Sequence, residues 1–479
     1  MTVLPRLTSV ALLLFATCFS SLAQNTFTDS EASDVKAFLH DNFNGKKDCI
    51  VIGLIDEHGS QVFGGGSLDN GTTNLVNGDS VFLIGSITKT LTALLLQDMA
   101  DRGEVKLDGL VALYLPKRVK MPMHGGKQIT LLNLATHTAG FPHDADNMTG
   151  KDWQEQFETY TADKMYAYLS KFNLSRDPGS EYEYSNFGAV LLGHVLSLRA
   201  GTNFESLLLD RICRPLRMDH TRISLTAEME SHLAMGHRDS GEPYPPAKLD
   251  LYAPAGGVHS TANDLLKYLS AQAGLTRSSL TPSIEKTHVI RYKDAHGYPG
   301  GTETNYYGNI AMPWMQRGDP SPAGMDLLGH AGGAGSYHGW VGFDMQQRRG
   351  VVALTTSSRF SIEDVGQAAL RRKGLRDNII EISPEIVGIG AALKLDDSDH
   401  RLHITSILAH SPASQAGLLA GVIIDRIDGI PTASKSLVEC VTLIRGQAGT
   451  KVRLELITGD GSKTNTMEIT RGKLQVAKR

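Results

Sequence analysis

Residues Ser86–Met99 read SITKTLTALLLQDM, an apolar run that opens on a serine and a lysine three positions apart. Its apolar residues recur at the three- and four-residue spacing of a buried helix face, and Gly103 follows where a helix C-terminus is expected. Positions i and i+3 lie one helical turn apart, so the Ser86 hydroxyl and the Lys89 amine are expected to face the same way. The stretch therefore predicts a helix that begins at a candidate nucleophile.

The chemistry of this pair depends on the protonation state of the lysine. An unprotonated amine can take the proton of a serine hydroxyl and make it a strong nucleophile. Free backbone N–H groups and partial positive charge at a helix N-terminus favour a serine alkoxide and disfavour protonation of the amine. The pattern S-x-x-K is common, and the alternative is a capping serine followed by a solvated lysine.

A second candidate group is Tyr184-Ser185-Asn186, just before a helical pattern over residues 187–200. In an extended segment, residues two apart project to the same side. A phenol and an amide would then enter a cleft together, where tyrosine can relay a proton and asparagine can hold a substrate carbonyl. The alternative is a buried tyrosine beside a helix cap.

A third group is His330-Ala331-Gly332-Gly333, which precedes a strand pattern. Glycines at a strand edge allow close approach of a substrate backbone. A backbone N–H there, together with that of Ser86, could aim at a developing oxyanion, a contact whose removal typically slows a reaction about 10²–10³-fold. The alternative is a glycine turn that leads into a hairpin.

Composition limits the function classes. The chain has 479 residues, of which 41% are hydrophobic and 20% charged, with a formal net charge of −4. These values indicate a globular chain of two or three domains and argue against a nucleic-acid partner, which would require a basic surface. The sequence contains neither C-x-x-C nor H-E-x-x-H, so we expect no metal and no cofactor.

The N-terminus resembles a secretory signal, predicted over residues 1–23. Arg6 precedes an apolar run over residues 10–19, and Ser21-Leu22-Ala23 offers a cleavage site. The run is short for a membrane span, which needs about 20 residues. We therefore expect a periplasmic or secreted protein without a stable membrane anchor. Cleavage would leave Cys49, Cys213 and Cys440, an odd number that predicts no disulfide framework.

Strand patterns lie at both ends of a helical middle region. Residues 49–56 and 61–66 read as a hairpin, residues 105–290 as mostly helices and loops, and residues 337–344 and 350–355 as strands. A helical pattern over residues 362–372 follows. We expect an α/β fold of the α+β sandwich type, with one antiparallel sheet flanked by helices and an inserted, mainly helical lobe. The active site is expected between the sheet and that lobe.

The order and spacing of the three groups resemble the penicillin-recognising serine hydrolases, specifically the branch related to class C β-lactamases. That branch includes D-alanyl-D-alanine carboxypeptidases, class C β-lactamases and some esterases. Three further segments agree with it: Leu134–Gly140 (LATHTAG), Pro178-Gly179 and Pro254–Thr261 (PAGGVHST). The resemblance covers about residues 45–372, and we predict a hydrolase domain over residues 24–378.

The resemblance implies a role for each residue. Ser86 would be the nucleophile, Lys89 and Tyr184 would share proton transfer, and Asn186 would bind the substrate amide. His330 and Gly332 would also contact substrate, and the N–H groups of Ser86 and Gly333 would form the oxyanion hole. Which of Lys89 and Tyr184 is the base in each step stays open.

Two positions depart from the family pattern. His330 stands where β-lactamases carry a lysine, which predicts an anchoring charge that titrates near neutral pH. Ala331 stands where the family has a threonine, and Ser336, Tyr337 and His338 are either its replacement or ordinary strand residues. His137 is interpreted as structural, because no second metal ligand lies at a suitable spacing.

Residues 379–476 resemble a bacterial PDZ domain. The resemblance is carried by Val387-Gly388-Ile389-Gly390, by Ser411–Leu418 (SPASQAGL) and by Val422–Gly429 (VIIDRIDG). In such domains the N–H groups of the glycine loop hold a peptide C-terminal carboxylate, and the peptide adds as a strand. The domain would recruit a protein tail or substrate peptide; the alternative is that it only packs on the hydrolase.

Together these features predict a serine hydrolase that cleaves D-Ala-terminated peptidoglycan peptides through an acyl-serine and is acylated by β-lactams. The alternatives are a class C-like β-lactamase, a small-ester hydrolase on the same scaffold, and a non-catalytic binding protein in which the PDZ domain is the working part. The intact set of Ser86, Lys89 and Tyr184 argues against the last of these.

Overall fold

The computed structural model describes residues 28–238, 240–296, 306–316, 327–379, 386–396, 401–408, 411–433, 435, 437–458 and 464–474. The signal predicted at residues 1–23 lies outside these ranges. Among the described residues, no helix is both long and apolar enough to cross a bilayer.

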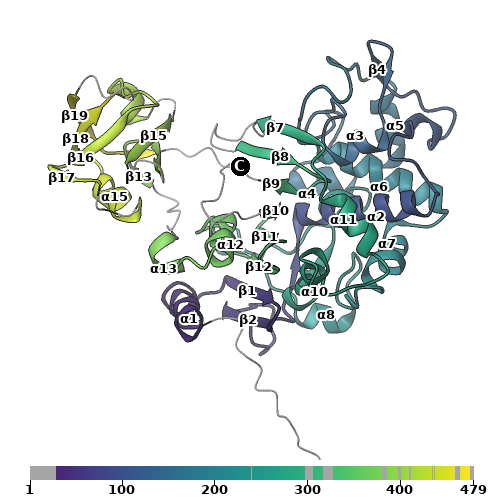
Figure 1. The fold of residues 1–479 in the computed structure, drawn as a ribbon, viewed down its shortest axis with the longest axis horizontal. Helices are drawn as coiled ribbons and strands as arrows, with labels where there is room; N and C mark the ends of the chain where they lie inside the picture. The colour runs from purple at the N-terminus through teal and green to yellow at the C-terminus, as the bar shows by residue number, and fades with distance from the viewer. Residues whose placement is uncertain are drawn as a thin grey trace, which may run out of the picture.

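One antiparallel sheet joins the two ends of the larger unit (Figure 1). Its strand order is β2-β1-β12-β11-β10-β9-β8-β7, so the N-terminal hairpin pairs directly with strands from about 300 residues later in the chain, as in the register of Ile50 with Thr355. The strands are β1 (Cys49–Asp56), β2 (Gly59–Gly66), β7 (Tyr292–His296), β8 (Tyr306–Ile310), β9 (Met315–Gln316), β10 (Leu327–Ala334), β11 (Tyr337–Asp344) and β12 (Arg349–Thr355).

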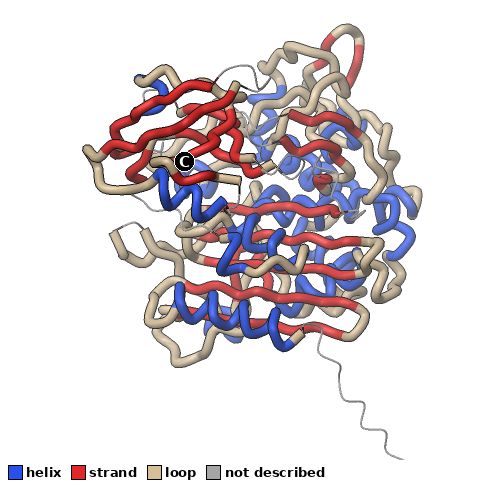
Figure 2. Tube along the Cα trace, turned by 60° about the vertical axis from the view of Figure 1, so that its left-hand side comes forward, coloured by secondary structure: helices blue, strands red, loops and turns tan. Residues whose placement is uncertain are grey.

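Helices cover both faces of this sheet, whose strands run side by side in Figure 2. Successive strand residues point to opposite faces, and β1 shows this directly: Ile50, Ile52 and Leu54 pack in one apolar core, whereas Cys49 and Val51 pack in the other. The first core also holds residues of α1 (Asp29–Phe43) and α12 (Ile362–Leu370), and the second holds those of α2 (Thr88–Asp101) and α10 (Ala262–Gln272).

The helical lobe is inserted between β2 and β7. Its other helices are α3 (Leu131–Ala135), α4 (Trp153–Glu158), α5 (Ala162–Leu169), α6 (Asn186–Ala200), α7 (Phe204–Leu208), α8 (Ala227–Ser231), α9 (Ala253–Gly256) and α11 (Thr281–Thr287), with short turns η1 (Gly85–Ile87), η2 (Val111–Leu113) and η3 (Leu209–Cys213). Small pairs of strands complete it: β3 (Val81–Leu83) with β6 (His259–Thr261), and β4 (Met123–His124) with β5 (Lys127–Gln128). Helix α13 (Leu375–Asn378) follows α12.

The C-terminal unit, yellow-green in Figure 1, has its own apolar core of residues between Ile389 and Ile469. Its sheet has the order β14-β15-β16-β18-β19, and β13 pairs with β20. The elements are β13 (Ile386–Gly388), β14 (Ala391–Leu395), β15 (Leu402–Ile407), α14 (Pro412–Gln415), β16 (Ile423–Ile427), β17 (Ile430–Pro431), α15 (Leu437–Ile444), β18 (Lys451–Ile457), β19 (Thr464–Thr470) and β20 (Gly472–Leu474).

The structure confirms the predicted fold class, with terminal strands in one antiparallel sheet and a mainly helical insertion. The alternative interpretation of residues 330–333 as a glycine turn is wrong, because they lie within β10 and the hairpin turn falls at Gly335-Ser336. Helix α1 and strands β7–β9 were not predicted. The domain boundary between residues 378 and 379 stays a prediction.

Candidate active site

Ser86 lies in η1, the single turn that leads into α2. Gly85 precedes it with a φ of +53°, in the left-handed region that glycine adopts freely. The turn packs closely on β10, because a side-chain carbon built on Gly85 would lie 2.6 Å from the backbone nitrogen of Gly333. The start of α2 and the strand that carries His330 are therefore held together at the serine.

Lys89 is one helical turn beyond Ser86 and only 2% exposed. Its Nζ lies 2.8 Å from Ser86 Oγ, 2.7 Å from Asn186 Oδ1 and 2.7 Å from the carbonyl oxygen of Ala255. Burial lowers the pKa of Lys89 to about 7, and the negative charge of Asp144 opposes this shift. Near pH 7 an amine with that pKa is present in both protonation states, and its unprotonated fraction can act as a proton acceptor.

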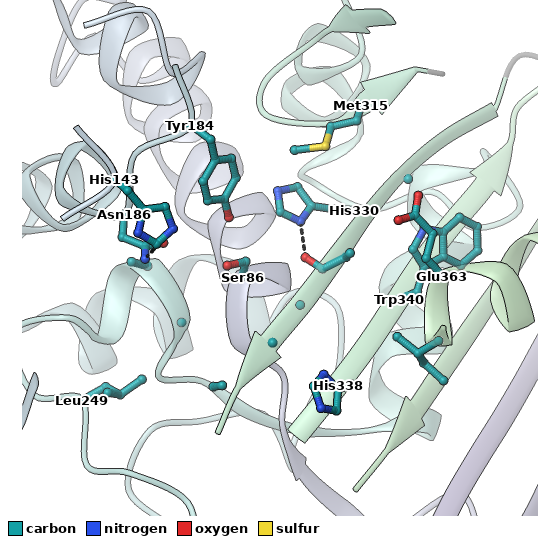
Figure 3. Close-up of a pocket in the computed structure, with 18 of the residues that line it drawn as sticks. Ser86, His143, Tyr184, Asn186, Leu249, Met315, His330, His338, Trp340 and Glu363 are labelled. Atoms are coloured by element: carbon teal, nitrogen blue, oxygen red, sulfur yellow. Dashed lines mark hydrogen bonds between the residues drawn. The ribbon is translucent and has the colours of Figure 1, made fainter. Parts of the chain in front are cut away.

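Tyr184 lies two residues before α6 and is buried. Figure 3 shows its hydroxyl pointing toward Ser86. The Lys89 Nζ lies 4.9 Å from the centre of the phenol ring. The ring stacks on His137 with 4.4 Å between ring centroids, and His143 lies 5.9 Å away. The phenol from a distant part of the chain is thus brought to the serine and the lysine.

Asn186 is the first residue of α6, and its side chain faces both Lys89 and the cavity. Besides accepting from Lys89, it places its Nδ2 3.4 Å from His143 Nε2. The carbonyl of His143 accepts from the N–H groups of Asn186 and Phe187, at 2.8 and 3.1 Å. Ser185 caps the helix, with its side chain accepting from the N–H of Gly188. These contacts fix the amide at the helix start.

His330 lies in β10 and is 2% exposed. Burial, together with the positive charge of Lys89, lowers its pKa to about 3. Its Nδ1 lies 2.6 Å from the carbonyl oxygen of Ala331, so the neutral ring donates there and leaves Nε2 as an acceptor. The expectation that His330 titrates near neutral pH is therefore wrong, and the physical reason is its burial beside a cationic group.

The candidate residues surround one cavity of about 440 Å³ between the sheet and the helical lobe, shown in Figure 3. Ser86, Tyr184, Asn186, His330, Gly332 and Gly333 all line it. Strand β9 pairs with β10 at Gly329, and the stretch of β10 from His330 to Ala334 borders the cavity. The location expected for the active site is where the sequence-predicted residues converge.

The cavity has further walls that the sequence did not indicate. His143 and Asp144 lie beside Asn186, joined by a 2.6 Å contact between His143 Nδ1 and Asp144 Oδ2. Trp340 of β11 and Glu363 of α12 line the opposite end in Figure 3. His143 and Asp144 follow the segment Leu134–Gly140 within four residues. This short separation is the sequence signal that could have indicated them.

A family model described as "Beta-lactamase" matches residues 41–375, which is more than half of the chain. The chain belongs to the beta-lactamase family. As a member of this serine hydrolase family, it contains the expected serine and lysine on one helix turn, with the tyrosine of a separate segment beside them. A second family model, described as a PDZ domain, matches residues 403–458.

Similar proteins include peptidases and β-lactamases. The D-alanyl-D-alanine-carboxypeptidase/endopeptidase AmpH of Escherichia coli K12 is 26% identical over 318 residues, covering 65% of this chain and 77% of the relative. A beta-lactamase of Pseudomonas fluorescens is 27% identical over 345 residues, 67% of this chain and 91% of the relative. A solved beta-lactamase/D-alanine carboxypeptidase from Yersinia pestis has the same fold, with a TM-score of 0.61 at 22% identity over 72% of this chain and 98% of that one.

In this beta-lactamase family member, the PDZ-like unit presents β14 at the edge of its sheet. The segment Val387–Gly390, which begins in β13, leads into that strand, with Ile389 buried and Gly390 at a φ of +79°. The Ser411 side chain donates to the carbonyl of Gly390 and packs where any side chain on that glycine would lie. The part of the chain that the structure describes contains no group of three side chains suited to a metal ion.

Proposed function

We propose that this chain is a secreted or periplasmic serine hydrolase that cleaves D-Ala-containing peptidoglycan peptides, as a D-alanyl-D-alanine carboxypeptidase/endopeptidase, and is acylated by penicillins. The observation that carries the proposal is the 2.8 Å contact between Lys89 Nζ and Ser86 Oγ, made by a buried lysine whose pKa is about 7. A relative named for that activity supports the choice of substrate.

The proposed chemistry is acyl transfer through serine. Ser86 Oγ attacks the carbonyl carbon of the penultimate D-Ala while its proton passes to the Lys89–Tyr184 pair. The bond to the terminal amine then breaks, and the same pair delivers the proton to that amine. Water hydrolyses the acyl-serine in a second cycle and releases a carboxylate.

The remaining residues are proposed to hold the substrate. Asn186 would bind its amide, the N–H groups of Ser86 and Gly333 would stabilise the oxyanion, and Gly332 would border the bound backbone. His330 would act as a neutral acceptor toward a substrate N–H or the Tyr184 hydroxyl. Because it is neutral near pH 7, it brings no positive charge to a substrate carboxylate.

The C-terminal unit is proposed to bind a protein C-terminal peptide at Val387, Gly388, Ile389 and Gly390, with the peptide adding beside β14, the outermost strand of the described sheet. A non-catalytic binding protein remains the competing function, and it predicts that Ser86 does not react.

Labelling with a fluorescent penicillin tests the proposal. The wild-type chain should carry the label on Ser86, and Ser86→Ala should remain unlabelled. Ser361→Ala is the matched control for loss of another serine hydroxyl at the cavity. The Ser361 side chain accepts from the N–H of Asp364 as the cap of α12, so the folded variant should still carry the label on Ser86. A label on Ser86→Ala, or none on the wild type, would contradict the assignment.

The lifetime of the label and the products separate the enzymatic alternatives. A label that persists, with loss of terminal D-Ala or of cross-links from muropeptides seen by mass spectrometry, supports the peptidase. Rapid loss of the label with turnover of the drug supports a β-lactamase. Hydrolysis of small esters with unchanged muropeptides supports an esterase.

A further inference from the structure

His137 lies in the segment Leu134–Gly140, to which the proposed chemistry assigns no step. It follows helix α3 and is 2% exposed, with a φ of +55°. That left-handed conformation is uncommon outside glycine and is tolerated best by asparagine, aspartate and histidine. Such a conformation costs free energy and persists beside an active site only where the surrounding contacts stabilise it.

His137 forms hydrogen bonds with both chain neighbours of Tyr184, one through its backbone carbonyl and one through its ring. Its carbonyl oxygen accepts from the N–H of Glu183 at 2.8 Å. Its ring Nδ1 accepts from the N–H of Ser185 at 3.1 Å. The carbonyl of Thr138 next to it accepts from the N–H of Gly179 at 2.7 Å, which extends the contact between the two segments. Tyr184 is therefore held from the residue before it and from the residue after it.

The His137 ring also contacts the phenol itself. The two rings stack at a centroid distance of 4.4 Å and an angle of 29°, and the ring of Tyr182 meets His137 edge-on at 5.9 Å. Stacking fixes the plane of the phenol, and the two backbone contacts fix the origin of its side chain. Both are needed to direct a hydroxyl group at Ser86.

This arrangement requires a neutral ring. Nδ1 accepts a hydrogen bond, so the proton of the neutral imidazole resides on Nε2. Burial and the positive charges of neighbouring groups, Lys89 foremost among them, hold the pKa of His137 well below its ordinary value. The acceptor that Ser185 needs is thus present whenever the fold is intact.

We propose that His137 is a positioning residue that directs the Tyr184 hydroxyl at Ser86 and Lys89 by clamping the chain on both sides of the tyrosine. The proposal rests on the acyl-serine function proposed above. The hydrogen bonds and ring stacking described above join His137 to Tyr184 and its two neighbours, so His137 acts through Tyr184.

The test compares two substitutions that both tolerate the left-handed backbone. His137→Asn keeps an acceptor near Nδ1, whereas His137→Gly removes acceptor and ring together. In the full-length protein, His137→Gly should lower the rate constant of penicillin acylation about 10²-fold, the loss typical of a misplaced catalytic group. His137→Asn should recover much of that loss. Rate constants rather than labelled amounts are compared, because a smaller folded fraction changes only the amount.

A double-mutant cycle with Tyr184→Phe distinguishes positioning from general structural support. When the phenolic hydroxyl is absent, His137→Gly should cause little further loss. His288→Asn is the control for loss of a half-buried histidine outside the proposed site, since His288 pairs with Gln272 through a 2.6 Å contact. Thermal unfolding of each variant checks its folding.

An unchanged acylation rate in folded His137→Gly, or the same loss in both Tyr184 backgrounds, would overturn the inference. A wild-type chain that takes no penicillin would instead contradict the proposed function. Hydrogen exchange then still tests the clamp: the peptide over residues 183–187 should exchange faster in His137→Gly than in His137→Asn, and equal protection in the two would refute it.

Discussion

At the scale of single residues, the site depends on how one buried amine is satisfied. A neutral amine has two N–H donors and one lone pair. Asn186 Oδ1 and the carbonyl of Ala255 can accept the two hydrogens, and the lone pair is then free to accept the proton of Ser86. The protonated form keeps all three contacts as donor. Because both forms are satisfied in place, the amine can cycle between them without rearrangement.

Asp144→Asn should shift the pH dependence of acylation to lower pH. The negative charge of Asp144 raises the pKa of Lys89, against the larger lowering by burial. Without that charge the pKa of Lys89 falls, so the unprotonated amine persists in more acidic solution. Acylation by penicillin, measured from pH 5 to 9, should therefore reach half of its plateau at lower pH than in the wild type.

Asp146→Asn is the matched control for this shift. Asp146 is two residues away and exposed, and it is not among the groups that perturb Lys89. Its substitution should leave the midpoint unchanged. A midpoint for Asp144→Asn that stays at the wild-type position or moves to higher pH would contradict the role given to that carboxylate.

At the scale of elements, glycine determines how η1 and β10 meet. A side-chain carbon on Gly332 would lie 2.1 Å from the carbonyl oxygen of Ile84, whereas one on Gly333 would meet nothing closer than His338 Nδ1 at 3.9 Å. Gly332→Ala should therefore cost about 1–3 kcal/mol of folding stability, the usual range for overpacking. It should also slow acylation, because the turn that bears Ser86 must move away.

Thermal unfolding checks this prediction, with Gly333→Ala as the control of identical chemistry one residue away. Gly333→Ala keeps its backbone N–H and should unfold at the wild-type temperature. Equal unfolding temperatures for the two variants would show that the close approach at Gly332 does not limit the packing of the turn.

Elements with strong local patterns were predictable from the sequence. Apolar β-branched runs identified β1 and β12, and the spacing of apolar residues identified α2. Strand β10 reads LLGHAGGA and has no β-branched residue, so its pairing with β11 decides its conformation. Helix α1 begins with a capping box of Thr28 and Glu31, a local pattern that marks a helix start in the sequence.

The candidate site was predictable in its residue types and their order, and not in its electrostatics. Ser86, Tyr184, Asn186 and His330 converge on one cavity, and Lys89 contacts Ser86 from beneath its wall. The pKa of His330 depends on burial and on the approach of Lys89, which are products of the whole fold. A local pattern around residue 330 therefore could not indicate that the ring is neutral.

At the scale of the whole molecule, the described residues form cores that do not overlap. The apolar core of the C-terminal unit begins at Ile389, whereas the cores that pack on the large sheet end at Ile379. All described residues that line the cavity come from the larger unit, the last of them Gln367. The proposed acyl-transfer site and the proposed peptide-binding segment Val387–Gly390 are thus built on separate apolar cores.

A chain that ends at Ile379 should consequently fold and react with penicillin at the full-length rate, because it keeps both cores of the large unit and every described cavity residue. A time course of penicillin labelling measures the reaction rate, and thermal unfolding measures the stability of the shortened chain. A chain that ends at Thr355 is the control: it lacks α12, whose residues Ile362 and Val365 belong to the core against β12, and it should fail to fold. Loss of acylation in the folded chain ending at Ile379 would mean that the C-terminal unit contributes to the serine site directly. Acylation would then depend on both units.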